Sequence, residues 1–240
     1  MKEAGTRKQA ILLMSHFFNR TIEEKYNRLC RELDEERYNV FLLLNVNDKQ
    51  TMQDIPTSVR LCLYDANDLN ELGYTPIYEK LLPGSCHFPV LKFFLEHREY
   101  NFYWFIEYDV EFTAPWNVLM DDYLQNEADF IAPFVEKYED KGAGKWNWWK
   151  LRNDSGFPLP ESIRTFHPIC RYSSAALLTI DEHQKKGYSA HSELLIPTCL
   201  YHAGLRLAQF DSWAKGVRYR PPYAANELKE SKILYHPVKP

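Results

Sequence analysis

The stretch "FYWFIEYDVEFTAPW", residues 102–116, decides the fold that we expect for this chain. Large apolar residues fill positions 102–106, and the acids Glu107, Asp109 and Glu111 follow with no basic residue among them. A continuous apolar run is typical of a strand covered on both faces, as in a parallel or mixed sheet flanked by helices. We therefore expect a buried strand that ends in a group of carboxylates.

The acids occupy alternate positions, which leaves two interpretations open. Alternate residues of an exposed strand share one face, so the acids would then lie on a solvated edge. The preceding apolar run favours the second interpretation, because open α/β sheets bind ligands at the carboxyl ends of buried strands. Clustered carboxylates repel one another unless a cation intervenes, and Mg²⁺ or Mn²⁺ prefers such oxygen-rich surroundings. The pattern thus favours a ligand or metal site at this strand end.

Similar apolar runs recur along the chain and alternate with segments that have helical spacing. We expect strands near residues 10–14, 40–46, 59–64, 102–107 and 129–134. This strand–helix alternation predicts an α/β fold with a mostly parallel central sheet and helices on both faces, in a single domain over residues 1–240.

Residues 136–166 combine Gly, Pro, Trp and charged residues without clean periodicity, and we interpret them as a long loop or small excursion. Trp146, Trp148 and Trp149 either anchor this segment in the core or form a platform for a bound acceptor.

Composition and short motifs exclude several classes of protein. The net charge of −4 gives no global attraction to nucleic acid. The five cysteines include no C-x-x-C, so neither a disulfide framework nor a zinc knuckle is indicated. No dinucleotide-binding G-x-G-x-x-G, P-loop or G-x-S-x-G motif occurs, and "HSE" with "PTC" lacks the second cysteine of a zinc deaminase. The apolar run at residues 10–14 is too short for a transmembrane segment, so we expect a cytoplasmic location.

Taken in order, four landmarks resemble the GT-A glycosyltransferases, which use nucleotide-sugar donors. They are "ILLMSHFFNRTIEEKY", the acidic motif "IEYDVEF", the later segment "AHSELLIPTCLYHAG" and the C-terminal "ILYHPVK". The resemblance covers most of the chain and implies a GT-A-like, Rossmann-like fold. It departs from the family at the D-x-D motif, where the acids are Glu107, Asp109 and Glu111.

The resemblance also implies roles for particular residues. Asp109, Glu111 and His236 would hold Mn²⁺ or Mg²⁺ beside the donor diphosphate, while Glu107 or Asp109 would meet the nucleotide ribose. Further contacts to the nucleotide are expected from residues that follow the first and third strands: Ser15, His16, Arg20 and Asp65. The plain alternatives are a turn residue for Asp65, a salt bridge at the helix start for Arg20, and a surface histidine for His236.

Glu193 is the candidate general base, and His191 is the second candidate. A carboxylate at position 193 would accept the proton of an attacking sugar hydroxyl, as in inverting enzymes. Its plain alternative is an acid in the first turn of a helix that Ser192 or Ser189 caps.

The function that these features predict is transfer of a sugar from a nucleotide-sugar donor to a carbohydrate or other hydroxyl acceptor, by a hexosyltransferase-like enzyme. The weakened D-x-D motif keeps a second hypothesis open, in which a GT-A-like domain binds a nucleotide sugar or a partner without turnover.

Overall fold

The computed structural model describes residues 8–46, 55–78, 84–141, 149 and 152–239. The chain divides into two compact units, each assembled from separate stretches. Unit 1 comprises Met1–Asp65, Glu99–Glu127 and Phe210–Pro240, and unit 2 comprises Ala66–Arg98 and Ala128–Gln209.

Unit 1 is built from parallel strands and two helices, followed by short strands from the end of the chain. Its elements are β1 (Gln9–Ser15), α1 (Arg20–Glu32), β2 (Tyr38–Asn45), β3 (Leu61–Tyr64), β4 (Phe102–Glu107), β5 (Glu111–Phe112), α4 (Trp116–Asp122), β13 (Gly216–Val217) and β14 (Leu234–His236).

The strands of unit 1 run in the order β4-β1-β2-β3. Each neighbouring pair is parallel, and β1 lies between β2 and β4 with Gln9 opposite both Tyr38 and Phe102. β1 and β4 are almost wholly buried, as their apolar runs require. The buried amide of Gln9 accepts a hydrogen bond from the Trp104 indole at 2.8 Å, so this polar pair is satisfied inside the core.

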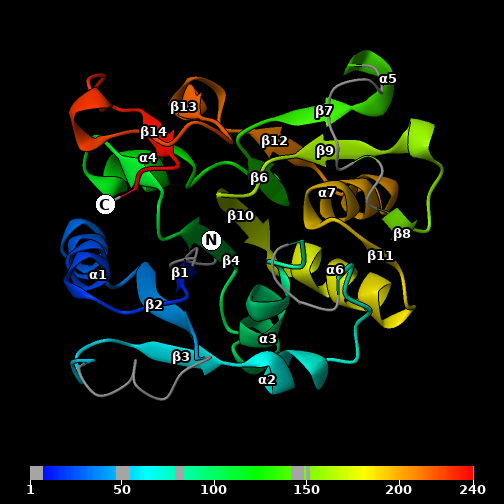
Figure 1. The fold of residues 1–240 in the computed structure, drawn as a ribbon, viewed down its shortest axis with the longest axis horizontal. Helices are drawn as coiled ribbons and strands as arrows, with labels where there is room; N and C mark the ends of the chain where they lie inside the picture. Colours follow the sequence, from blue (N-terminus) through cyan, green and yellow to red (C-terminus); the bar gives the residue numbers. More distant parts are fainter. Residues whose placement is uncertain (1–7, 47–54, 79–83, 142–148, 150–151, 240) are drawn as a thin grey trace, which may run out of the picture. The chain divides into compact units, whose positions relative to one another are not determined.

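Helix α1 packs beside β2 (Figure 1). Ile22, Tyr26 and Leu29 recur at helical spacing and are buried. Asn19 caps the helix, because its side chain accepts a hydrogen bond from the Ile22 N–H at 3.1 Å. Two basic residues of this helix, Lys25 and Arg28, contact the segment that follows β4.

Unit 2 has shorter strands and more helix. Its elements are α2 (Ala66–Asn70), α3 (Phe88–Glu96), β6 (Phe130–Ala132), β7 (Val135–Lys137), α5 (Tyr138–Lys141), β8 (Arg152–Asp154), β9 (Ile163–Thr165), β10 (Ile169–Ser173), α6 (Ser174–Lys185), β11 (Ser189–Ala190), α7 (Ser192–His202) and β12 (Leu207–Gln209).

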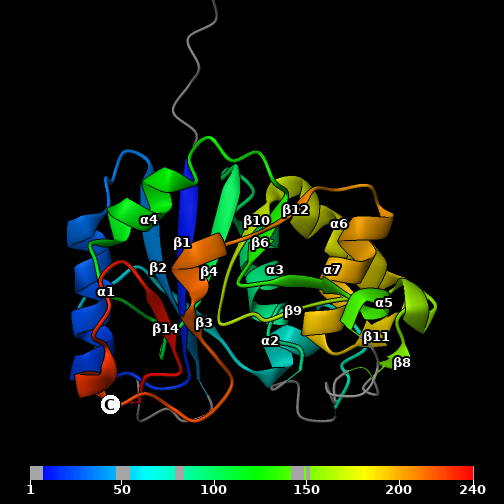
Figure 2. The ribbon, with the colours of Figure 1, turned by 90° about the horizontal axis from the view of Figure 1, so that it is seen from above.

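The strands of unit 2 run in the order β12-β6-β10, with β12 parallel and β10 antiparallel to β6. Helices α6 and α7 pack side by side in this unit (Figure 2). Ser173 caps α6 by accepting a hydrogen bond from the Ala176 N–H at 3.0 Å. The turn after α7 ends at Gly204, whose φ of 77° is the left-handed conformation that glycine adopts readily.

The predicted class, a mixed α/β protein with a mostly parallel main sheet, is confirmed. In unit 1, β4, β1, β2 and β3 are parallel throughout, and in unit 2 β6 is parallel to β12 and antiparallel to β10. Each of the expected strands is present, as β1, β2, β3, β4 and β6. Among the helices that the structure describes, none has both the length and the apolarity that crossing a bilayer requires.

The stretch 136–166 is more ordered than a plain loop where it is described. β7 pairs with β9 in antiparallel fashion, with Val135 opposite Thr165. Trp149 is buried and packs edge-to-face on Tyr138 at 5.0 Å between ring centroids, so it anchors the segment instead of presenting an exposed platform. Trp146 and Trp148 lie outside the described residues.

Candidate metal centre

The acidic motif does not continue as one strand. The Val110 N–H donates to the Glu107 carbonyl at 3.0 Å and closes a turn between β4 and β5. Glu107 therefore ends β4, Asp109 lies in the turn, and Glu111 begins β5. Because the turn breaks the two-residue alternation of a strand, the acids are free to face different neighbours.

The C-terminal segment meets this turn through backbone pairing. β14 runs antiparallel to β5, with Tyr235 opposite Glu111, and the Val238 N–H donates to the Asp109 carbonyl at 2.8 Å. β13 covers the other edge of β14, and only glycine fits at Gly216, where a Cβ would lie 2.6 Å from the Leu234 carbonyl oxygen. These ladders bring His236 to the acidic turn although the two are far apart in the chain.

Glu107, Asp109 and His236 converge at this point. His236 Nε2 lies 3.3 Å from Glu107 Oε2 and 3.5 Å from Asp109 Oδ1. One potential ligand atom from each residue falls within 4.8 Å of the others, and in the described ranges this is the single group of its kind. Asp109 and His236 are buried, with 5% and 6% of their surface exposed. We call these three residues the acid–histidine triad.

The orientation of the imidazole suits a metal ligand. His236 Nδ1 lies 2.9 Å from the Arg218 carbonyl oxygen, which can only accept, so Nδ1 carries a proton and Nε2 faces the acids. Metal-bound histidines are commonly oriented by such a hydrogen bond from the second nitrogen. Burial lowers the pKa of His236, but the neighbouring carboxylates of Asp109 and Glu107 outweigh this effect and raise the pKa to about 9.

The donor atoms of the triad fit a divalent cation. Asp109 Oδ1 is buried and accepts no hydrogen bond, although it lies at ion-pair distance from His236. A buried carboxylate oxygen without such a partner is costly, and a cation would satisfy it. Two carboxylates with one imidazole suit Mn²⁺ better than Mg²⁺, because Mg²⁺ favours oxygen ligands alone.

Two further side chains, Tyr108 and Lys239, border the triad. Lys239 Nζ lies 2.6 Å from Asp109 Oδ2 and 2.9 Å from the Tyr108 hydroxyl. Burial raises the pKa of Asp109, but His236 and Lys239 together lower it below its usual value. The expectation from sequence missed Lys239, because a lysine near a chain end gives no signal that distinguishes it from a surface residue.

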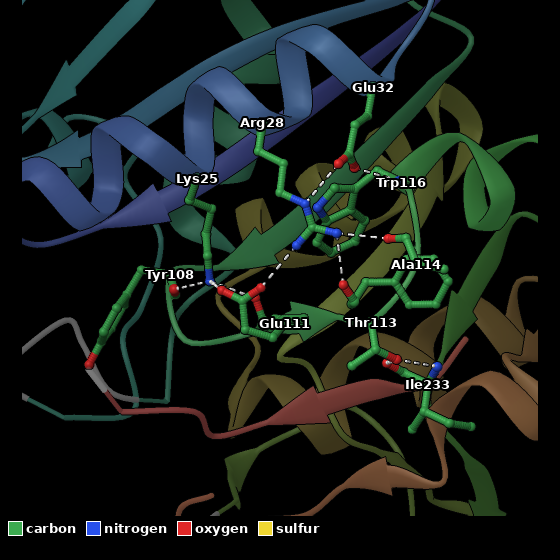
Figure 3. Close-up of polar contacts among 11 residues, drawn as sticks. Lys25, Arg28, Glu32, Tyr108, Glu111, Thr113, Ala114, Trp116 and Ile233 are labelled. Atoms are coloured by element: carbon green, nitrogen blue, oxygen red, sulfur yellow. Dashed lines mark hydrogen bonds and ion pairs between the residues drawn. The ribbon is translucent and has the colours of Figure 1, made fainter. Parts of the chain in front are cut away.

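The Glu111 side chain lies against helix α1, beside Lys25 and Arg28 (Figure 3). Its Oε1 lies 2.6 Å from Lys25 Nζ and its Oε2 lies 3.3 Å from the Arg28 guanidinium. Both carboxylate oxygens are thus engaged, and Glu111 does not join the group that could hold a metal. We therefore correct the ligand set expected from the sequence, replacing Glu111 by Glu107.

Lys25, on helix α1, holds the backbone of the acidic turn in place. Its ammonium also donates to the carbonyl oxygens of Tyr108 at 2.6 Å and Val110 at 2.7 Å, the residues on either side of Asp109. With Glu111, these acceptors use all the donors of one ammonium group. Arg28 adds hydrogen bonds to the carbonyl oxygens of Phe112 and Ala114, so α1 holds the whole segment after β4 (Figure 3).

Of the four residues expected to contact a nucleotide, three lie at or just after the carboxyl ends of β1 and β3, and the fourth, Arg20, lies at the exposed start of α1. Ser15 ends β1 and hydrogen-bonds to the backbone of Phe17, while the His16 ring lies edge-on to Tyr108 at 5.1 Å. Their place follows from the parallel pairing of β1 and β4, which brings both carboxyl ends to one edge. Asp65 directly follows β3 and is half-buried. Arg20 is exposed and forms an ion pair with Glu24 at 2.8 Å. This is the salt bridge at the helix start that the sequence analysis gave as the alternative to a nucleotide contact.

The candidate bases lie in unit 2, at the start of α7. His191, and neither Ser192 nor Ser189, caps the helix, because its Nδ1 accepts from the Glu193 N–H at 3.3 Å. Burial lowers the pKa of His191 to about 4, so the ring is neutral at physiological pH. Glu193 lies in the first helical turn, is 8% exposed, and places Oε2 3.9 Å from His191 Nδ1.

No protein-family model matches the chain, and a search of curated proteins gives no match either. The functional assignment therefore rests on the residues of the site.

Proposed function

We propose that this protein is a cation-dependent glycosyltransferase, which moves a sugar from a nucleotide-sugar donor to a hydroxyl acceptor. The observation that carries this proposal is the acid–histidine triad, in which residues of β4, the following turn and β14 converge on one point. The triad follows the carboxyl end of a parallel strand, where α/β proteins bind nucleotides.

Departure of a nucleoside diphosphate leaves negative charge that must be stabilised. A divalent cation held by Glu107, Asp109 and His236 would supply that stabilisation when bound. The protein contributes a preformed set of donors: Lys25 holds the turn, and the Arg218 carbonyl orients the imidazole. Such preorganisation keeps the cost of assembling the site low.

Sugar transfer also needs a group that accepts the proton of the acceptor hydroxyl, and we assign this step to Glu193. A buried carboxylate in the first turn of a helix is held in place by its surroundings, as a general base must be. His191, neutral at physiological pH, is the second candidate. Ser15, His16 and Asp65, at the carboxyl ends of β1 and β3, are the residues that we expect to contact the nucleoside.

The test is a thermal-shift screen of UDP-, GDP-, CMP- and dTDP-sugars in the presence of Mn²⁺. A ligand at about 100 times its dissociation constant adds roughly 2.7 kcal/mol to the free energy of unfolding, which gives a readily measured rise in Tm. We expect at least one nucleoside-diphosphate sugar to raise Tm in Mn²⁺, and the rise to disappear when EDTA removes the metal.

A donor-hydrolysis assay with the stabilising compound then separates the two hypotheses. Release of free sugar and nucleotide supports the enzyme. Stabilisation without hydrolysis or transfer to any acceptor points to a domain that binds nucleotide sugars without turnover. If no donor raises Tm, the nucleotide-sugar proposal fails.

A further inference from the structure

The first turn of α7 depends on a histidine nitrogen that carries no proton. The Glu193 N–H donates to His191 Nδ1 at 3.3 Å, so this nitrogen is the acceptor that caps the helix. A proton on Nδ1 would turn the acceptor into a donor and break the bond. The imidazolium would also face the positive end of the helix dipole. Capping by His191 therefore requires the neutral ring.

The helix start is tied to the loop before α3, which carries another buried histidine. The Ser192 N–H donates to the Gly84 carbonyl at 2.8 Å, and the Ser192 hydroxyl lies 3.2 Å from the Cys86 thiol. His87 follows directly and is 2% exposed. Within the described residues, neither of its ring nitrogens has a hydrogen-bond partner. A charged His87 would carry two N–H donors with no acceptor for either, so this ring must also stay neutral.

Three buried histidines of unit 2 thus influence one another's protonation. Burial lowers the pKa of His191 to about 4. Burial first, and then the neighbouring His191 ring, lowers the pKa of His87 to about 3. Burial, with the rings of His191 and His87, holds the pKa of His167 well below its usual value. A proton on any one of these rings would repel a proton on the next.

Other titratable groups near the helix start do not reverse this balance. Glu193 Oε2, 3.9 Å from His191 Nδ1, would favour a proton on the ring, but burial outweighs it. On β9 and α6, which pack against α7, the charged side chains pair with other residues or are exposed. Arg164 pairs with Glu136, Asp181 pairs with Lys185, Glu182 and Lys186 are exposed, and burial lowers the pKa of His183.

We propose that His191 is an acid-sensitive cap, whose protonation releases the first turn of α7 together with the Glu193 carboxylate. When the turn opens, water reaches the ring, which then takes up a proton below about pH 6.5. The closed helix resists that proton until about pH 4, so acid favours the open state throughout this interval. Above pH 7 both states hold a neutral ring, and the cap adds no pH dependence. This device acts on the helix whether or not the protein transfers sugars.

Hydrogen exchange of the amides of residues 192–195 tests the cap, because their acceptors are the Gly84 carbonyl and groups of His191. After correction for intrinsic exchange rates, we expect the opening equilibrium of the wild type to rise by at least about twentyfold from pH 7 to pH 5. This factor is what one histidine contributes when its pKa falls from its ordinary value to about 4. Amides of β10, in the same unit, should lose much less protection, which distinguishes local release from unfolding.

Two replacements of His191 separate capping from titration. Asn also caps helices but does not titrate, so His191→Asn should match the wild type at pH 7 and show an acid response about twentyfold smaller. Ala neither caps nor titrates, so His191→Ala should open about fivefold more than the wild type at pH 7. The wild type is thus expected to resemble the Asn variant at pH 7 and the Ala variant at pH 5.

Two variants at other positions complete the test. His202→Asn changes an exposed histidine at the opposite end of α7 and should keep the wild-type response. His87→Leu removes a buried ring without hydrogen bonds and should reduce the acid response while keeping the cap at pH 7. An acid response that is equal in wild type and His191→Asn would overturn the acid-sensitive cap. Equal protection of His191→Ala and wild type at pH 7, or equal loss in β10 and residues 192–195, would overturn it as well.

Discussion

Replacing Glu193 by Gln is expected to lower turnover by about 10²–10⁴-fold, the usual contribution of a general base. The amide has nearly the same shape as the carboxylate but cannot take the proton of the acceptor hydroxyl. Donor binding in the presence of Mn²⁺ should stay at the wild-type level, because we assign Glu193 to the acceptor and not to the nucleotide. Transfer and hydrolysis rates with the donor from the screen, beside its thermal shift, measure the two effects separately.

The matched control for this change is Glu182→Gln, an exposed carboxylate on the neighbouring helix α6 of the same unit. It should leave both turnover and donor binding unchanged. Turnover of Glu193→Gln within about twofold of the wild type would remove Glu193 from the mechanism, since general-base catalysis contributes far more than that. His191 would then be the remaining candidate in this segment.

Replacing Lys25 by Met is expected to lower the free energy of unfolding by about 3–5 kcal/mol, the typical cost of removing one partner from a buried ion pair. The lysine side chain is 7% exposed. Its loss leaves the carbonyl oxygens of Tyr108 and Val110 without their donor and removes the closest cation from Glu111. Urea unfolding at equilibrium measures the change, with the midpoint and slope analysed together.

Arg20→Met provides the comparison from the same helix. Arg20 and Glu24 are 90% and 64% exposed, and an exposed pair of this kind contributes little because water and salt screen it. Lys25→Met should therefore be much the more destabilising of the two. A Lys25→Met protein as stable as Arg20→Met would show that the ammonium does not hold the turn, and the preorganisation of the triad would lack its support.

The main strands were predictable because their physical signal is local. Residues 102–106, like the run in β1, are apolar at every position, which fits a strand buried on both faces. Helix α1 likewise shows its buried face as a repeat at helical spacing. The order within residues 136–166 was not predictable, because β7 and β9 are three residues each and are stabilised by each other, not by a periodic pattern of their own.

The candidate site was predictable only in part. Acids after a buried strand indicated a site, and the order of landmarks suggested that His236 would meet Asp109, which the structure shows. The alternate spacing of the acids does not predict which of them point the same way, because the turn closed by Glu107 and Val110 interrupts the strand geometry. The partner of Glu111 depends on how α1 packs, and the partner of Asp109 depends on the path of the chain after β14. Both are tertiary contacts with no sequence pattern.

Binding of Mn²⁺ to the purified protein, followed by the electron paramagnetic resonance signal of free Mn²⁺, tests the acid–histidine triad most directly. We expect the wild type to take up a single Mn²⁺ with pyrophosphate present. We expect Asp109→Asn and His236→Ala to weaken that binding by at least about tenfold, since even residues that only support a ligand have effects of this size. Glu111→Gln should keep Mn²⁺ binding, because Glu111 faces Lys25 and Arg28. Wild-type affinity in both Asp109→Asn and His236→Ala, or loss of binding in Glu111→Gln alone, would contradict the triad as the metal site.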